Sequence, residues 1–206
     1  MARDRSPITK QSRREGYALH NKAHKILVKR QNMPGQSPNI RMRRNVSQFG
    51  VQLREKQKVK RLYGLLERQF RRMMKEAGKS RGKSGEVLLQ LLERRLDNVI
   101  YRAGFAISRR AARQLVSHGH FEVNDKRLNI PSYRVEPADK ISVRQQSRTS
   151  GYFANLNELT AAAETVPISW LKVNKKQFKI EVTGLPVRED AEANINEQLI
   201  VEYYSK

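Results

Sequence analysis

Closely spaced arginines in "ISRRAARQLVSHGHFEVNDKRLNI", residues 107–130, are the first side chains whose types and spacing suggest a chemistry. Arg109, Arg110 and Arg113 follow Ser108, a residue type that commonly caps a helix. Guanidinium groups donate hydrogen bonds in a planar fork that matches phosphate oxygens, and the first turn of a helix also attracts anions. The pattern indicates a phosphate-binding surface, with an ordinary solvated helix face as the alternative.

A longer cationic pattern runs through residues 51–77, where apolar and basic residues separate at helical spacing. The apolar stripe consists of Val59, Leu62, Tyr63, Leu66, Phe70, Met73, Met74 and Ala77. The basic arc consists of Lys58, Arg61, Arg68, Arg72 and Lys75, with Leu65 as an apolar exception among them. A solvated helix face usually mixes both signs of charge, and the face opposite the apolar stripe has Glu76 but few other acids, so phosphate contact is favoured. Gly64 is a candidate break between two helices.

The charge of the whole chain agrees with a polyanionic partner. Lys and Arg total 42 against 20 Asp and Glu, a formal net charge of +22 over 206 residues. Residues 1–86 hold 24 of the basic and 6 of the acidic residues, whereas residues 149–206 hold 6 and 8. Nucleic acid is the expected partner, because its phosphates offset the repulsion among like charges and release counterions when neutralised. A membrane surface is less favoured, since no segment joins a basic face to membrane-seeking aromatic residues.

Missing residue types and segments argue against several protein classes. There is no cysteine, and therefore neither a disulfide nor a thiolate metal site. His20 and His24 have the i, i+4 spacing of some metal sites, but no further ligand lies nearby, so neither a metal nor a cofactor is expected. No stretch approaches the roughly 20 apolar residues of a membrane-spanning helix, and the N-terminus has no apolar signal-peptide region. The expected location is the cytoplasm.

The remaining periodicities predict an α+β protein. Residues 1–50 are basic and irregular, and residues 79–85 ("KSRGKSG") form a linker. One helix is predicted over residues 86–105, and another begins after Ser108 and ends at Gly119. Strands are predicted from the alternating residues Phe121/Val123, Leu128/Ile130, Val135 and Ile141/Val143, and from residues 169–186, which predict a further hairpin with Trp170 in the core. Residues 154–164 look helical, and the tail from Ile195 is expected to pack against protein.

Four stretches, in this order, resemble the family of the bacterial small-subunit ribosomal protein four. They are "GVQLREKQKVKRLYGLLERQF", "LLERRLDNVIYRAGFAISRRAARQLVSHGHFEVN", "NIPSYRVEPADKISV" and "INEQLIVEYYSK". The helix-helix-hairpin segment alone is less specific, because the same RNA-binding module occurs in pseudouridine synthases and tyrosyl-tRNA synthetases. Two features depart from the family. The four-cysteine zinc knuckle of many members is missing, and the hairpin turn is Asn124-Asp125 where Asn-Gly is usual.

The resemblance implies a structural constituent of the small ribosomal subunit, which binds the 5′ domain of 16S rRNA early in assembly and holds a five-helix junction there. It also implies contact with small-subunit ribosomal protein five, an interface that influences translational accuracy, and with mRNA in the channel through which the message enters. The segment matching the mRNA contacts is "NIRMRRN", so the candidates are Arg41, Arg43 and Arg44. The candidates for rRNA binding are Arg13, Arg14, Arg54, Lys56, Lys58, Arg61, Arg68, Arg72, Lys75, Lys83, Ser108, Arg109, Arg110, Arg113, His118 and Lys126.

Three segments are predicted from the resemblance and the periodicities together. They are a basic N-terminal segment at 1–50, a helical rRNA-binding domain at 51–91 completed by about 185–206, and a domain at 92–184. The last contains the helix-helix-hairpin RNA-binding module at about 92–150, extended by a small antiparallel sheet. The C-terminal tail is predicted to pack back on the helical domain.

Two other functions stay open at this point. A stand-alone RNA-binding factor uses the same module in a short chain, and the long basic N-terminal part argues against it. An RNA-modifying enzyme is suggested by "RRLDNV", residues 94–99, which resembles the motif of the catalytic aspartate in pseudouridine synthases. The 58 residues after position 148 are too few for a catalytic domain, and Asp97 is expected to be a surface residue near Arg94 and Arg95. We therefore expect neither an enzyme nor a small-molecule substrate.

Overall fold

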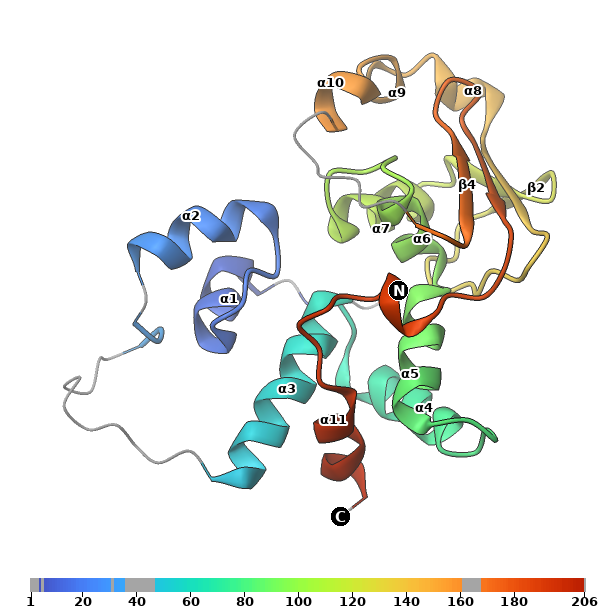
Figure 1. Ribbon diagram of the computed structural model, residues 1–206. Coiled ribbons are helices and arrows are strands. Elements are labelled where there is room, and N and C mark those ends of the chain that lie inside the picture. Colours follow the sequence, from blue (N-terminus) through green and yellow to red (C-terminus); the bar gives the residue numbers. More distant parts are fainter. Residues whose placement is uncertain (1–3, 5, 31, 36–46, 161–167, 206) are drawn as a thin grey trace. The chain divides into compact units, whose positions relative to one another are not determined.

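Two structural units make up the chain in the computed structural model, which describes residues 4, 6–30, 32–35, 47–160 and 168–205 (Figure 1). The first unit comprises Met1–Leu88 and Asn194–Lys206, and the second comprises Leu89–Ala193. Within the described residues the first unit contains helices without strands, and the strands belong to the second unit. The C-terminal segment therefore completes the unit that the N-terminal part begins.

The first unit is built around helix α3, which has neighbours on two sides. Its helices are α1 (Ile8–Glu15), α2 (Asn21–Lys29), α3 (Gln48–Leu62), α4 (Glu67–Ala77) and α11 (Glu197–Tyr204), and α5 (Ser84–Glu93) leads into the second unit. Helix α1 contacts α2 and α3, and α11 lies along α3 (Figure 1). The prediction that the tail packs back on the helical domain is confirmed.

Gly64 separates α3 from α4, as its position in the sequence predicted. Its φ of +64° lies in the left-handed region that a residue with a Cβ atom enters at a cost. The chain turns here, and the amide of Leu65 donates to the carbonyl of Lys60 at 2.9 Å. Because the helix does not continue, Leu65 is buried in the core instead of lying among the cations.

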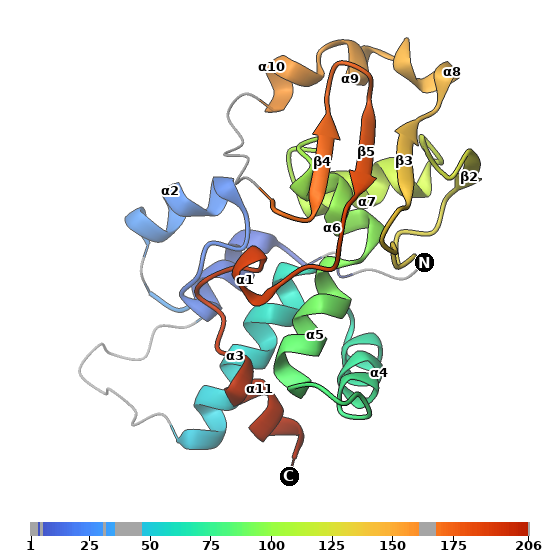
Figure 2. The same ribbon diagram turned by 45° about the vertical axis from the view of Figure 1, so that its right-hand side comes forward.

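The second unit combines an antiparallel sheet with two helices on one of its faces. Its elements are α6 (Leu96–Arg102), α7 (Arg109–Ser117), β1 (Phe121–Val123), β2 (Lys126–Leu128), β3 (Lys140–Val143), α8 (Gln145–Arg148), α9 (Gly151–Ala154), α10 (Leu156–Thr160), β4 (Leu171–Asn174), β5 (Lys179–Val182) and the 3-10 helix η1 (Arg188–Asp190). The five strands are ordered β2-β1-β3-β5-β4, and every pair is antiparallel. Figure 2 shows α6 and α7 behind the strands, while the other face of the sheet is turned toward the viewer.

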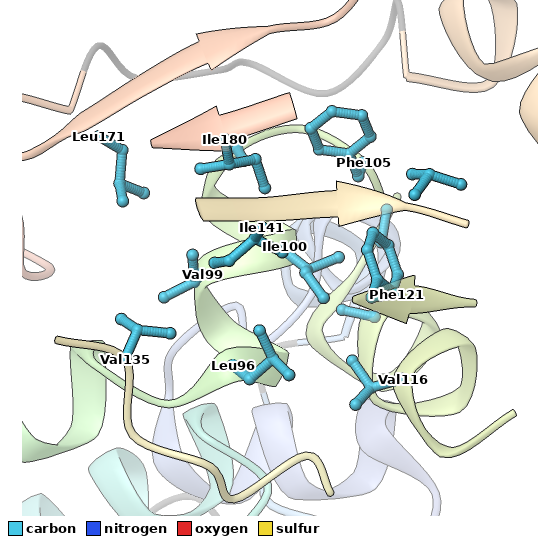
Figure 3. Packing of buried hydrophobic residues seen from close by; sticks show 14 of the residues in the cluster. Leu96, Val99, Ile100, Phe105, Val116, Phe121, Val135, Ile141, Leu171 and Ile180 are labelled. Atoms are coloured by element: carbon cyan, nitrogen blue, oxygen red, sulfur yellow. The ribbon is translucent and has the colours of Figure 1, made fainter. Parts of the chain in front are cut away.

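The core of the second unit lies between this sheet and the helices. Alternate strand residues such as Phe121, Ile141 and Ile180 face the apolar sides of α6 and α7, which contribute Leu96 and Val116 among others (Figure 3). These side chains are almost completely buried, and the burial of their apolar surface is the main contribution that they make to the stability of the fold. Trp170 is also buried in this core, as its sequence position predicted.

Three sequence predictions for this unit are wrong, one of them the strand at Val135, which lies in a loop between β2 and β3. The single helix expected over residues 86–105 is broken between α5 and α6, because the backbone there pairs with a distant segment. The amide of Leu96 donates to the carbonyl of Tyr133, and the amide of Val135 donates to the carbonyl of Arg94, both at 2.9 Å. Ile130 lies beyond the end of β2 and is exposed. Residues 161–164 of the predicted helix over 154–164 lie outside the described residues.

Candidate nucleic-acid interface

Helix α4 presents basic side chains to solvent along its length. Its opposite side is buried through Phe70, Met73, Met74 and Ala77. Its exposed residues include Arg68, Arg71, Arg72 and Lys75, none of which forms an ion pair with the described part of the chain. An unneutralised basic row of this kind repels itself and suits a run of phosphates. We refer to these four residues as the α4 basic face.

The predicted rRNA-binding cations Lys56 and Lys58 on α3 have partners inside the protein instead. Lys56 is only 3% exposed, with its Nζ 2.9 Å from Oε1 of Glu67 and 4.6 Å from the ring centre of Tyr203. Lys58 donates to the backbone carbonyl of Asn194 at 2.6 Å. Both side chains therefore join α3 to other parts of the first unit, and phosphate contact through Lys56 would require it to leave the core.

Glu67 is the acceptor on which several of these contacts converge. It accepts hydrogen bonds from Lys56 Nζ and Lys60 Nζ, each at 2.9 Å, and from the Tyr204 hydroxyl at 2.8 Å. Burial by itself raises the pKa of this carboxyl, but the three hydrogen bonds outweigh it and lower the pKa of Glu67 to about 2. The carboxylate stays charged at neutral pH and links α3, α4 and α11.

The predicted cations Arg54 and Arg61 share a buried partner on α1. Nη1 of Arg54 lies 3.2 Å from Oε1 of Glu15, and Arg61 donates to the same oxygen. The Glu15 side chain is fully buried, and this burial raises its pKa, although the two arginines oppose the shift. Arg61 is mostly covered, whereas Arg54 keeps 40% of its side chain exposed. The two arginines anchor α1 to α3.

The other predicted cations of the first unit differ in exposure. Arg13 donates to the backbone carbonyl of Asn32 from Nε and Nη2, at 3.1 and 2.8 Å. Arg14 is exposed. Lys83 is exposed, with an ion pair of 3.1 Å to Glu86 one turn along. The predicted mRNA contacts Arg41, Arg43 and Arg44 lie outside the described residues.

The helix α7 begins as its sequence predicted. The Ser108 side chain accepts a hydrogen bond from the backbone amide of Ala111 at 3.2 Å, which is the usual geometry of an N-cap. Arg110, in the first turn, is partly exposed, and His118, directly after the helix, is exposed. Lys126 is exposed at the start of β2. Of the predicted module residues, His118 and Lys126 are therefore the fully accessible ones, and Arg110 is accessible in part.

Arg109, by contrast, is held by a network inside the second unit. Its Nε donates to Oδ1 of Asn98 at 2.8 Å, its Nη2 lies 3.1 Å from Oε1 of Glu192, and its guanidinium stacks 4.7 Å from the ring centre of Tyr101. Asn98 in turn donates to Oε2 of Glu93 at 2.6 Å. The network fixes α6 to α7 and to the segment before residue 193, which gives Arg109 a role within the fold.

Arg113 is buried and forms an ion pair with Asp97. Nη1 of Arg113 lies 3.3 Å from Oδ2 of Asp97, and Nη2 of Arg95 lies 3.1 Å from the same oxygen. The side chains of Arg113, Asp97 and Arg95 are 8%, 7% and 4% exposed, respectively. The expectation that Asp97 lies on the surface is therefore wrong, although cations do surround it. A carboxylate held by two arginines inside the core has no open side at which a substrate could react.

The tip of the β1–β2 hairpin is a tight turn that is held by hydrogen bonds of the Asn124 side chain. Asn124 and Asp125 have φ values of 50° and 61°, as a two-residue type I′ turn requires. The Asn124 side chain donates to Oδ1 of Asp139 at 2.8 Å and accepts from the amide of Lys140 at 2.9 Å. The departure from Asn-Gly is therefore accommodated without loss of the turn.

Sequence reasoning missed some exposed cations near α4. Arg71 adjoins Arg72 and belongs to the same exposed side of the helix, and Lys79 and Arg81 are exposed in the turn that follows. Arg71 is three residues from Arg68 and four from Lys75, so the helical spacing that selected those two residues also contains the signal for Arg71.

An α+β protein with an exposed basic helix and a basic helix-helix-hairpin module belongs to the class of RNA-binding proteins. No helix in the described part of the chain has both the length and the apolar character to cross a bilayer. Residues 3–93 match the family model described as ribosomal protein S4/S9 N-terminal domain, and residues 94–141 match the S4 domain.

Full-length relatives agree with both matches. The chain is 52% identical over 206 residues to the small ribosomal subunit protein uS4 of Chloroflexus aurantiacus, with 100% of both chains covered. Proteins of the same name from Roseiflexus sp. and Chlorobium limicola also show 52% identity over 206 residues and full coverage. The chain therefore belongs to the small ribosomal subunit protein uS4 family, a family of structural ribosomal proteins that are not enzymes.

Proposed function

We propose that this protein is a primary rRNA-binding protein of small-subunit assembly, which holds a multi-helix junction in the 5′ domain of 16S rRNA. The observation that carries the proposal is the α4 basic face, whose four cations have no ion pair within the described chain. Family membership makes rRNA the expected polyanion. The bound RNA would be recognised mainly through its backbone and shape, because arginine and lysine contacts to phosphate carry little base information.

Rigid positioning is the second part of the mechanism. The contacts of Glu67 with α3 and α11 fix the helix that carries the basic face, so little conformational entropy remains to be lost when RNA binds. In the module, the partners of Arg109 and Arg113 orient α7 and thereby Arg110. We assign phosphate contact in the module to Arg110, His118 and Lys126, and a positioning role to Arg109 and Arg113.

The proposal extends to mRNA and to a protein partner. Contact with mRNA through Arg41, Arg43 and Arg44, contact with small-subunit ribosomal protein five and an influence on translational accuracy are supported by resemblance to the family. Cross-linking of the protein to total cellular RNA tests the RNA part. Cross-links concentrated in the 5′ domain of 16S rRNA support the proposal, and cross-links spread over unrelated RNAs contradict it.

A double substitution on α4 tests the basic face directly. In Arg68→Glu plus Arg72→Glu, affinity for a transcript of the 16S 5′ domain should fall, because phosphates are then repelled. The charge-neutral pair Arg68→Gln plus Arg72→Gln should lower the slope of log K against log salt by about 2, or about one per lost phosphate contact.

Arg68→Lys plus Arg72→Lys is the matched control, since it keeps both charges and should keep the slope. Circular dichroism should report an unchanged helix content in all three variants, because both side chains are exposed. A flat salt dependence of the unsubstituted protein would refute electrostatic binding, and a joint loss of helix and binding would make the residues structural.

A further inference from the structure

The face of the sheet away from α6 and α7 carries a second group of cations. The register places Lys140 of β3 opposite Glu181 of β5, and Glu181 opposite Lys172 of β4. In the neighbouring row, Lys179 of β5 lies between Ser142 of β3 and Asn174 of β4. Residues paired in this way share one face, and the neighbouring strand residues that point to the other face form the core. Figure 2 shows this face uncovered by the helices of the same unit.

The hairpin that joins β4 to β5 enlarges this group. Lys175 and Lys176 lie in the turn, so Lys172, Lys175, Lys176 and Lys179 follow one another along one hairpin. None of these four lysines forms an ion pair with the described part of the chain, and three of them are exposed, with Lys175 partly exposed. Lys140 forms a long ion pair with Glu181, in which Nζ lies 3.9 Å from Oε1. We call the four residues the hairpin lysines.

The net charge of the C-terminal region does not reveal this group of lysines. Residues 149–206 hold more acids than bases, yet four of their six basic residues are the hairpin lysines. Three of the acids in this region have partners away from the hairpin. Glu192 pairs with Arg109, Asp190 accepts a hydrogen bond from Ser169, and Glu202 accepts one from Gln52. The segment with net negative charge therefore contains a locally basic surface.

Protection of a sheet edge is the ordinary explanation for lysines of this kind. Charged side chains on an edge strand discourage pairing with another chain. That explanation covers Lys172, because β4 is the edge of the sheet, but not Lys179 and Lys140, which belong to the interior strands β5 and β3. Cross-strand pairs on a solvated face usually alternate in sign. Here one carboxylate faces two lysines, and Lys179 has no acid opposite it.

We propose that the hairpin lysines, with Lys140, form a second RNA-binding surface that contacts the sugar-phosphate backbone. The inference rests on the proposed function, because it takes rRNA as the bound polyanion and adds a surface to it. The residues paired across this face of β3, β5 and β4 include no aromatic side chain on which a base could stack, so the contacts are to phosphates and insensitive to base sequence.

Neutralising the hairpin lysines tests the surface in the full-length protein. For Lys172→Gln, Lys175→Gln, Lys176→Gln and Lys179→Gln combined, the slope of log K against log salt on the 16S 5′ domain transcript should fall by about 3 to 4. Affinity at moderate salt should fall on the order of tenfold, since exposed charge contacts are individually weak. The midpoint of thermal unfolding should not change, because the lysines have no partner to lose.

The opposite change on the same face is the matched control. Glu181→Gln removes the carboxylate between Lys140 and Lys172, and should raise affinity for the same transcript. Acetylation of lysine amines, read by mass spectrometry with and without the transcript, gives a direct footprint. The hairpin lysines should react more slowly when RNA is bound.

The two proposals fail in distinguishable ways. If the unsubstituted protein binds the transcript with a steep salt dependence, but the quadruple variant keeps its slope and the lysines stay unprotected, the sheet surface is refuted and the α4 basic face stands. If the lysines are protected only in the assembled subunit and never by RNA alone, a protein covers this face and the inference is overturned. A flat salt dependence of the unsubstituted protein refutes both.

Discussion

Removal of the charge on Asp97 should show whether the arginines of the module are structural. Asp97→Asn removes the carboxylate that Arg95 and Arg113 share in the core, where both lie within 3.3 Å of it and are less than a tenth exposed. Breaking a buried ion pair by removing one partner typically costs about 3–5 kcal/mol. That is a large part of the total stability of a domain, about 5–15 kcal/mol.

The expected size of the effect can be measured by thermal unfolding. About 1 kcal/mol shifts the midpoint by roughly 4–8 °C in a domain of up to about 100 residues, so the midpoint of the second unit should fall by at least about 12 °C. Circular dichroism during heating records this transition. The triple variant Arg95→Met, Asp97→Leu and Arg113→Met should be more stable than Asp97→Asn, because apolar side chains then replace the buried charges at these three positions.

Measurements of RNA binding distinguish an arginine that positions the helix from one that contacts phosphate. Below its unfolding transition, Arg113→Met should weaken binding to the 16S 5′ domain transcript and leave the slope of log K against log salt unchanged. A phosphate contact would lower that slope by about 1. Arg113→Lys keeps the charge and is the control. An unchanged midpoint for Asp97→Asn, or a reduced slope with an unchanged midpoint for Arg113→Met, would refute the buried network as the reason for the position of α7.

Two further predictions concern the first unit. Since the pKa of Glu67 is about 2 in the folded protein and 4.5 for an ordinary glutamate, its charge stabilises the fold above about pH 4.5, and that contribution disappears as the pH falls toward 2. Glu67→Gln should therefore lower the unfolding midpoint in urea at pH 7, and the difference from the unsubstituted protein should narrow in acid; a difference constant with pH would contradict this. Gly64→Ala should lower the free energy of unfolding by about 1 kcal/mol, because Gly64 has a φ of +64°. Gly64→Asn should cost less, and an unchanged urea midpoint for both would show that the turn is not strained.

Local signals in the sequence were sufficient where a neighbouring residue decides the structure. Ser108 caps α7 through an amide three residues away, and Gly64 and Gly119 have positive φ values at helix ends. Alternation of apolar residues located β1 and β3, and the hairpin of β4 and β5. These features depend on backbone conformation and on side chains within a few positions, so the sequence pattern contains the information that determines them.

The break between α5 and α6 had no comparable signal. Helical spacing continues through Arg94 and Arg95, yet the backbone there bonds to residues around Tyr133. A distant segment supplies hydrogen bonds that replace those of the helix, and no local propensity reports them. The same limit explains why Asp97 was expected on the surface.

What the sequence by itself determined was the chemical character of the protein: a basic chain with α+β periodicities and the ordered motifs of an RNA-binding ribosomal family. Only the tertiary structure decided which cations face solvent. Arg109 pairs with Glu192, which is 83 positions away in the sequence, and Arg61 pairs with Glu15, which is 46 positions away. Both arginines therefore form contacts within the fold. Arg68 meets no such acid in the described chain and stays exposed. The sign of a charge is a property of the residue, whereas its availability to a phosphate depends on which acids the fold brings within a few ångströms.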